Sequence, residues 1–323
     1  MVLTIVFASI ALVLTAGAVF LVARYLPIIV NLFLNVTVRR RPEKDEILPG
    51  EDVAFETADG VHLRGTLTPA PGNNPSAPVI VFCHEYTANR HTARKYAGFL
   101  MDAGFRIFAF DFRGHGDSVL PNGYFPRQWA TEYELSDLRA ALRYLRGRSD
   151  VSATRVGFFG MSRGAVTAIA VAADDPGVAG VVSDGAFCTK ITLESYMRRW
   201  APIFADVRKM LWLLPPFVFS GLRKMAIRFS EHRVGIRFVR LAPALRRLRT
   251  PILFIHGEED SYLQMSQART LFELAGDRKE LWVVQGADHN GAIDAQPEEY
   301  IRRTTGFFRR TLSVQEARQP SVR

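Results

Sequence analysis

The chain has 323 residues, 48% of them hydrophobic and 23% charged, which is the composition of a globular protein with a sizeable core. It has only two cysteines, Cys83 and Cys188, and no cluster of Cys and His with ligand spacing, so neither a disulfide framework nor a zinc site is indicated. The formal net charge is +9, a value that by itself favours no partner until its distribution along the chain is known.

The chain begins with a long apolar segment. No charged side chain occurs from Val2 to Ala23, and a helix rising about 1.5 Å per residue over that length spans the roughly 30 Å core of a bilayer. Basic residues follow the run, at Arg24 and at 39–41, whereas a cleaved signal peptide would carry them before it. We therefore expect residues 1–41 to be an uncleaved anchor with the following domain on the cytoplasmic side. A second apolar run, 26–38, would extend the span, lie in the interface or pack on the soluble domain.

After a polar linker at 42–50, apolar strands alternate with amphipathic helices. A hairpin is predicted over 51–68 from its Asp-Gly turn. Further strands are expected at 79–83, 106–110, 156–160, 180–183, 252–255 and 281–284, and helices at 90–103, 134–146, 165–172, 264–274 and 298–312. This alternation predicts a doubly wound, mostly parallel α/β sheet, in which functional sites lie at the carboxyl ends of the strands.

The alternation is interrupted from Lys190 to Arg249, where no strand is predicted. This stretch has fourteen basic and three acidic residues, so its surplus of eleven positive charges exceeds that of the whole chain. Aromatic residues are interleaved with the basic ones, a pattern that suits either a solvated face or contact with anionic lipid.

A serine motif stands at the centre of the predicted sheet. The apolar strand that starts at Val156 runs into Gly160-Met161-Ser162-Arg163-Gly164 and then directly into a helix. Glycines on both sides of Ser162 allow strand and helix to approach closely, and the helix N-terminus favours a developing negative charge. This stretch resembles the nucleophile elbow of the α/β-hydrolase superfamily.

The resemblance implies a catalytic triad in the chain order Ser, Asp or Glu, His. His289, after the last predicted strand, is then the base for Ser162, and Asp260 is the acid that orients it. Asp260 ends His256-Gly257-Glu258-Glu259-Asp260, which is similar to a turn of the superfamily. Asp184, after the preceding strand, is the rival for the acid, because some relatives place it there.

The resemblance also implies an oxyanion hole made by two backbone N–H groups. One is that of Arg163, and the other is expected from Tyr86, which could instead offer its phenol. Glu85 stands where the superfamily has a glycine, so it could alter the loop or act as a second carboxylate. The turn from Asp111 to Ser118 also matches the superfamily and is expected to be a structural brace.

The resemblance covers 51–312 without the insert at 190–249, which lies where relatives carry a cap over the site. Residues 313–323 are expected to be a tail. The cap's aromatic side chains would line a substrate tunnel or pack the cap, and its basic residues lead us to expect that it rests on the membrane and admits acyl substrate from there.

The sequence thus predicts a membrane-anchored serine hydrolase that cleaves an ester or thioester of a small acyl or lipid-like molecule through an acyl-enzyme on Ser162. No cofactor and no metal are needed, because all reacting groups belong to the protein. There are two alternatives. One is a serine peptidase or amidase of the same fold, and the other is a non-catalytic binding module in which Glu85 disrupts the oxyanion hole. Nucleic-acid binding is disfavoured, because the basic residues accompany a cap and a span.

Overall fold

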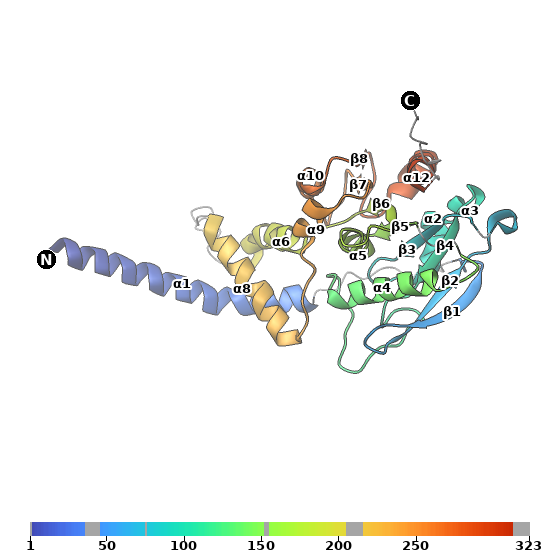
Figure 1. Ribbon diagram of the computed structural model, residues 1–323. Helices are drawn as coiled ribbons and strands as arrows, with labels where there is room; N and C mark the ends of the chain where they lie inside the picture. Colours follow the sequence, from blue (N-terminus) through green and yellow to red (C-terminus); the bar gives the residue numbers. More distant parts are fainter. Residues whose placement is uncertain (1, 36–45, 75, 152–154, 205–215, 313–323) are drawn as a thin grey trace, which may run out of the picture. The chain divides into compact units, whose positions relative to one another are not determined.

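The computed structural model describes residues 2–35, 46–74, 76–151, 155–204 and 216–312. It divides into two compact units, coloured along the sequence in Figure 1. The helical unit comprises 1–37 and 189–238, and the sheet unit comprises 38–188 and 239–323. The arginines at 39–41, residues 42–45 of the predicted linker and the predicted tail lie outside the described residues.

The sheet unit is built on eight strands in the order β1-β2-β4-β3-β5-β6-β7-β8. Antiparallel pairing joins β1 to β2 and β2 to β4, and all other neighbours are parallel. The strands are β1 Glu51–Glu56, β2 His62–Leu67, β3 Val79–Cys83, β4 Arg106–Phe110, β5 Val156–Met161, β6 Val178–Asp184, β7 Ile252–Gly257 and β8 Lys279–Val284. The predicted α/β class and mostly parallel sheet are confirmed.

The burial of each strand follows from its sequence. Every residue of β3 to β7 is buried, which explains their nearly continuous apolar runs, since helices cover both faces of a parallel sheet. The edge strand β1 buries only Val53 and Phe55, and the residues between and beside them are exposed. This period of two is the pattern of a strand with one face on the core and one face in solvent.

The helices of the sheet unit lie mainly where the sequence predicts them. They are α2 Ala93–Ala97, α3 Phe99–Asp102, α4 Glu132–Arg146, α5 Arg163–Ala172, α9 Leu241–Arg247, α10 Met265–Leu274, α11 Ala292–Ala295 and α12 Pro297–Leu312. Short 3-10 turns occur at Pro71–Asn73 and Arg90–Thr92. The single helix predicted over 90–103 is therefore wrong: it is a 3-10 turn followed by α2 and α3. These meet at Gly98, where a side chain would overlap the Arg94 carbonyl oxygen.

Two glycines of β5 show how the helices cover the sheet. A side chain at Gly157 would overlap Phe308 of α12, and one at Gly160 would overlap Ala165 of α5. Because these two positions face opposite sides of the strand, α5 and α12 pack on opposite faces of the sheet (Figure 1). The strand end that carries Ser162 is thus enclosed by tightly packed backbone.

The helical unit contains α1 Val2–Asn35, α6 Thr189–Phe204 and α8 Pro216–Val234. Both α1 and α6 pack on α8. Val30, Phe33 and Leu34, near the end of α1, are buried, and the Phe33 ring meets Phe238 edge-on at 4.9 Å. The described part of the second apolar run, 26–35, therefore continues α1 and packs within this unit.

The first part of α1 has a different environment. Its large apolar side chains are exposed, and the most apolar window of 18 residues has no buried residue. By length and composition α1 can cross a membrane. It is a candidate span, and its position near the N-terminus is one it shares with signal sequences.

The two units divide the predicted cap. The helical unit ends at Phe238, while α9 and the arginines at 246, 247 and 249 belong to the sheet unit, where α9 packs on α5 and α10. Part of the positive charge assigned to the cap thus lies on the sheet unit. The predicted cap residues 205–215 lie outside the described residues.

The packing around the first turn of α5 gives a test. A side chain at Gly164 would overlap the carbonyl oxygens of Cys83 and His84. We expect Gly164→Ala to destabilise the sheet unit by about 1–3 kcal/mol, because backbone must move to admit the methyl group. Chemical denaturation measures the difference.

Gly306→Ala is the matched control, because Gly306 also lies in a helix of this unit and has only the end of the Arg310 side chain within 4 Å. This change should stabilise the unit by up to about 1 kcal/mol, the usual gain of alanine over glycine in a helix. Equal effects of the two substitutions would contradict the close approach.

Candidate active site

The turn between β5 and α5 holds Ser162 in a strained conformation. Its φ of 47° and ψ of −110° lie in a region that non-glycine residues rarely adopt. The Ser162 N–H donates to the Asp184 carbonyl oxygen at 2.7 Å, and the Ser162 carbonyl accepts from the Val166 N–H at 3.2 Å. The hydroxyl therefore projects from the carboxyl end of β5, at the start of α5.

A chain of hydrogen bonds joins three residues from separate strand ends. His289 Nε2 lies 2.9 Å from Ser162 Oγ, and His289 Nδ1 lies 2.7 Å from Asp260 Oδ2. Asp260 follows β7 and His289 follows β8. The structure thus brings together the three residues that the sequence singled out as nucleophile, acid and base.

The Asp260 carboxylate is fixed on its other side. Its Oδ1 accepts from the N–H groups of Tyr262 and Leu263, at 2.9 and 2.8 Å. The side chain is 1% exposed, while that of His289 is 18% exposed. The carboxylate is therefore oriented toward the imidazole, which keeps access to solvent.

Further bonds join the loops that carry these two residues. Asp288 Oδ1 accepts from the N–H of Ser261 at 2.9 Å, and the Glu259 N–H donates to the Ala287 carbonyl at 2.9 Å. The two loops are consequently tied to each other at several points, and their geometry does not depend on the His289–Asp260 bond alone.

The charges around His289 favour its protonated form. Burial lowers the pKa of His289, but the hydrogen bond and charge of Asp260, with the charges of Asp184 and Asp288, outweigh burial and raise the pKa above its ordinary 6.5. An imidazole in this setting accepts a proton readily, which is the property that a general base needs.

Asp184, the rival acid, has another arrangement. Its buried carboxyl accepts from Tyr300 Oη at 3.2 Å and from Asn290 Nδ2 at 3.4 Å. Its backbone carbonyl accepts from both Ser162 and Asn290. Asp184 therefore fixes the serine turn relative to the histidine loop, and it is Asp260 that bonds to the ring.

Asn290 and Tyr300 are contributors that the sequence interpretation missed. Asn290 has a φ of 58°, a conformation that asparagine tolerates better than most residues. The Asn-Gly pair directly after His289 is a turn signal that could have drawn attention to it. Nothing in the sequence places Tyr300, on α12, beside Asp184.

Arg163, directly after the serine, has a fully buried side chain. Its guanidinium donates to the Arg127 carbonyl at 2.9 Å and lies 3.1 Å from His115 Nε2. It also lies 3.5 Å from Glu134 and stacks over the Tyr86 ring. Burial, together with the Arg163 charge, lowers the pKa of His115 to about 3. His115 is therefore neutral and accepts from the guanidinium.

The loop after β3 lies against the start of α5, as the tight fit around Gly164 shows. The Tyr86 phenol donates to the Pro126 carbonyl at 3.3 Å, so in this structure it is bonded away from the serine turn. Glu85 is buried, and its charge helps to raise the pKa of Tyr300 after the larger effects of burial and Asp184.

The turn after β4 is held in place by buried ion pairs, as expected of a structural brace. Asp111 is fully buried and pairs with Arg90. Arg113, in the same turn, pairs with Asp137 and Asp59. In the described part of the chain no group of three or more His, Cys, Asp or Glu could hold a metal ion. Both cysteines are buried free thiols.

Comparison with known proteins adds a family to this geometry. The sequence model of a family described as "Alpha/beta hydrolase family" matches residues 80–303. The uncharacterized protein YfhR of Escherichia coli O157:H7 is 26% identical over 271 residues, which are 82% of each chain. The uncharacterized protein YqkD of Bacillus subtilis is 27% identical over 267 residues, covering 80% of this chain and 79% of that protein.

Solved structures share the fold. An esterase of Pyrococcus furiosus superposes with a TM-score of 0.60 at 24% identity, covering 85% of this chain and 96% of that one. The alpha/beta hydrolase GrgF of Penicillium has a TM-score of 0.61 at 18% identity, covering 82% and 99%. At these identities the likeness concerns the fold.

The burial of Asp184 has a measurable consequence. Burial raises the pKa of Asp184 from 3.8 to about 7, against the opposing effects of His289, Tyr300 and Asn290. Between those two pH values the folded chain keeps a proton that the unfolded chain has released, so this group makes the fold less stable as pH rises. Asn at position 184 has no such titration. We therefore expect the stability of Asp184→Asn relative to wild type to increase from pH 4.5 to 7.5, by at most about 1.4 kcal/mol per pKa unit.

Urea denaturation of both proteins at the two pH values measures this change. The amide also loses a bond at every pH, because Tyr300 and Asn290 both donate to this position. Both donors favour the charged carboxylate, so this loss is larger at pH 7.5, and the pKa of Asp184 already includes that preference. A difference between variant and wild type that does not vary with pH would contradict the raised pKa.

Proposed function

The chain belongs to the alpha/beta hydrolase family, and we propose that it is a membrane-anchored serine hydrolase that cleaves an ester or thioester of a small acyl or lipid-like molecule. The observation that carries the proposal is the chain of hydrogen bonds from Ser162 through His289 to Asp260. Nucleophile, base and orienting acid in this order are what acyl transfer to a serine requires.

The proposed reaction has two stages. His289 Nε2 takes the proton of Ser162 as its oxygen attacks the substrate carbonyl carbon, and then gives that proton to the leaving alcohol or thiol as the acyl-enzyme forms. Water, deprotonated by His289, then attacks the acyl-enzyme, and the carboxylic acid leaves as Ser162 regains its proton. Asp260 holds the ring and stabilises the imidazolium in both stages.

We assign the oxyanion hole to two backbone groups. The Arg163 N–H is at the N-terminus of α5, where orphan donors and the helix dipole favour negative charge. The Tyr86 N–H is the second donor in this proposal. The contact of the loop after β3 with α5, and the stacking of the Arg163 guanidinium on the Tyr86 ring, support that assignment.

An ester or thioester is favoured over an amide by the similar structures, several of which are esterases. A peptidase or amidase would use the same residues and is the alternative. The anchor at 1–41, the sheet domain within 51–312 and the cap within 190–249 remain parts of this proposal, with the domain on the cytoplasmic side.

The buried end of α1 supports retention of the anchor. Three side chains near the end of α1 pack within the helical unit, those of Val30, Phe33 and Leu34. The helix α1 is continuous up to Asn35. Cleavage behind the apolar run would remove or shorten a helix on which α8 packs. An uncleaved span is compatible with this packing.

Substitutions in the triad test the mechanism. Ser162→Ala should abolish both hydrolysis of p-nitrophenyl esters and labelling by a fluorophosphonate probe, because no nucleophile remains. Asp260→Asn should lower kcat by on the order of 10³–10⁴-fold, because the amide stabilises the wrong tautomer of His289. A panel of esters of graded chain length also identifies the preferred acyl group.

Glu259→Gln is the control, since Glu259 is exposed in the same turn and should leave turnover close to that of wild type. Undiminished probe labelling of Ser162→Ala would refute the nucleophile. A wild-type protein that neither labels nor turns over any ester would favour a binding module. If Asp184→Asn, but not Asp260→Asn, lost most activity, the acid would be Asp184.

The anchor makes a separate prediction. Protease added to intact cells should spare the catalytic domain and digest it after permeabilisation, because the basic residues after the span keep that side in the cytoplasm. N-terminal sequencing of the mature protein should begin at Met1 or Val2. A mature N-terminus beyond the apolar run would show a cleaved signal sequence instead.

A further inference from the structure

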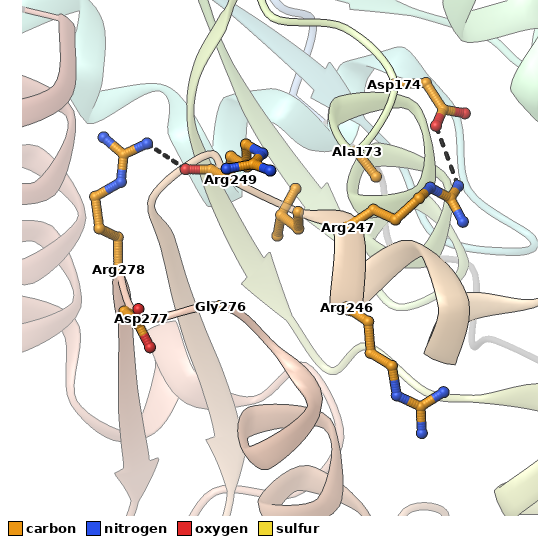
Figure 2. A pocket seen from close by; sticks show the side chains of 9 residues that line it. Ala173, Asp174, Arg246, Arg247, Arg249, Gly276, Asp277 and Arg278 are labelled. Carbon is orange, nitrogen blue, oxygen red and sulfur yellow. Dashed lines mark hydrogen bonds and ion pairs between the residues drawn. The ribbon is translucent and has the colours of Figure 1, made fainter.

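Arginine side chains from separate segments surround a hollow of about 780 Å³ on the sheet unit (Figure 2). We call it the arginine groove and define it by Arg246, Arg247, Arg249 and Arg278, with Asp174 and Asp277. The first two arginines end α9, the third lies in the loop behind that helix, and the fourth lies in the loop before β8. The buried Leu248 forms part of the lining.

The groove is separate from the proposed active site. Arg249 and Arg278 lie just before β7 and β8, so they stand at the amino ends of these strands. Asp260 and His289 follow the carboxyl ends of the same two strands. Because β7 and β8 are parallel, the groove and the triad lie at opposite edges of the sheet.

Positive charge in the groove exceeds the negative charge. Arg247 pairs with Asp174 at 3.1 Å. Arg278 donates to the Arg249 carbonyl oxygen, and this bond holds the Arg278 side chain without neutralising its charge. In the part of the chain that the structure describes, no ion pair joins Arg246, Arg249 or Arg278 to a carboxylate. Three arginines that have no carboxylate partner in the described residues therefore line this hollow.

A second hollow extends the positive surface. It is lined by Arg139, Arg143 and Arg146 of α4 and shares Asp174 with the groove. Arg139 and Arg146 pair with Asp174 and Asp175, at 3.4 and 2.8 Å. Both carboxylates of this surface are thus already paired, and Asp174 pairs with two arginines, Arg139 and Arg247.

We propose that the arginine groove binds an anionic ligand that bears at least two phosphate groups. All four basic residues are arginines, whose planar guanidinium binds phosphate through two parallel hydrogen bonds. Their attachment to two separate segments of the chain suits phosphates that are several ångström apart. A bound polyanion would supply the carboxylate-free arginines with negative partners, and it would leave the triad at the other edge free for catalysis.

The ligand's phosphates could belong to a soluble polyphosphate compound or to lipid headgroups. The sequence interpretation assigned the arginines at 246, 247 and 249 to a cap that contacts anionic lipid, whereas the structure groups them with the sheet unit. The experiment therefore uses the full chain in lipid nanodiscs, with inorganic tripolyphosphate as the probe.

Isothermal titration calorimetry in low salt should detect binding of tripolyphosphate to the wild-type chain in neutral nanodiscs. Arg249→Gln/Arg278→Gln should weaken it at least about tenfold, since each charge-assisted bond contributes on the order of a tenfold change in Kd. The charge-matched control is Arg228→Gln/Arg233→Gln, at two exposed positions of α8, which should bind as wild type does. No binding by the wild type, or an equal loss in both variants, would overturn the proposal.

Nanodiscs with cardiolipin, a lipid that bears two phosphate groups, distinguish the two sources. If lipid headgroups occupy the groove, tripolyphosphate binds more weakly there than in neutral nanodiscs, and this difference disappears in Arg249→Gln/Arg278→Gln. Equal affinity in both kinds of nanodisc indicates a soluble ligand. The groove variant should retain ester turnover, and because binding is measured without turnover, failure of the proposed hydrolase mechanism would leave this test intact.

Discussion

The close approach of α5 to β3 and β5 is the constraint on which the site depends. Gly160 and Gly164 have no side chains, so the backbone of the first turn of α5 lies directly against the strand ends. The chain makes this turn by placing Ser162 at a positive φ, which costs on the order of 1–3 kcal/mol. The core that surrounds the sheet offsets this strain, and the serine hydroxyl is presented at the sheet edge.

The second requirement is that three loops keep fixed positions relative to one another. These are the serine turn, the loop of Asp260 and the loop of His289. Asp184 serves this purpose with its backbone and its side chain, since its carbonyl accepts from Ser162 and its carboxyl accepts from Asn290 and Tyr300. The Asp288–Ser261 bonds join the loop of His289 to the loop of Asp260. The geometry of the Ser162–His289–Asp260 chain thus depends on a buried polar network as well as on the three residues themselves.

Positive charge is divided between the two units. The helical unit carries an exposed apolar helix and basic residues on α8, features that suit a membrane interface. The sheet unit carries the arginine groove at the edge away from the triad. Net charge alone does not separate these two surfaces.

Local sequence determined much of this protein. The continuous apolar runs of β3 to β7 and the Gly-x-Ser-x-Gly turn predicted the α/β class and the position of Ser162, because burial on both faces and a tight strand-to-helix turn each leave a short-range pattern. The order of Asp260 and His289 after their strands was also readable.

Only the tertiary structure decided that Asp260 bonds to the imidazole while Asp184 binds Asn290 and Tyr300, because both carboxylates follow neighbouring strands. It also decided that the arginines at 246–249 meet Arg278 around a groove, since that proximity arises from the parallel pairing of β7 and β8 and leaves no periodicity in the sequence.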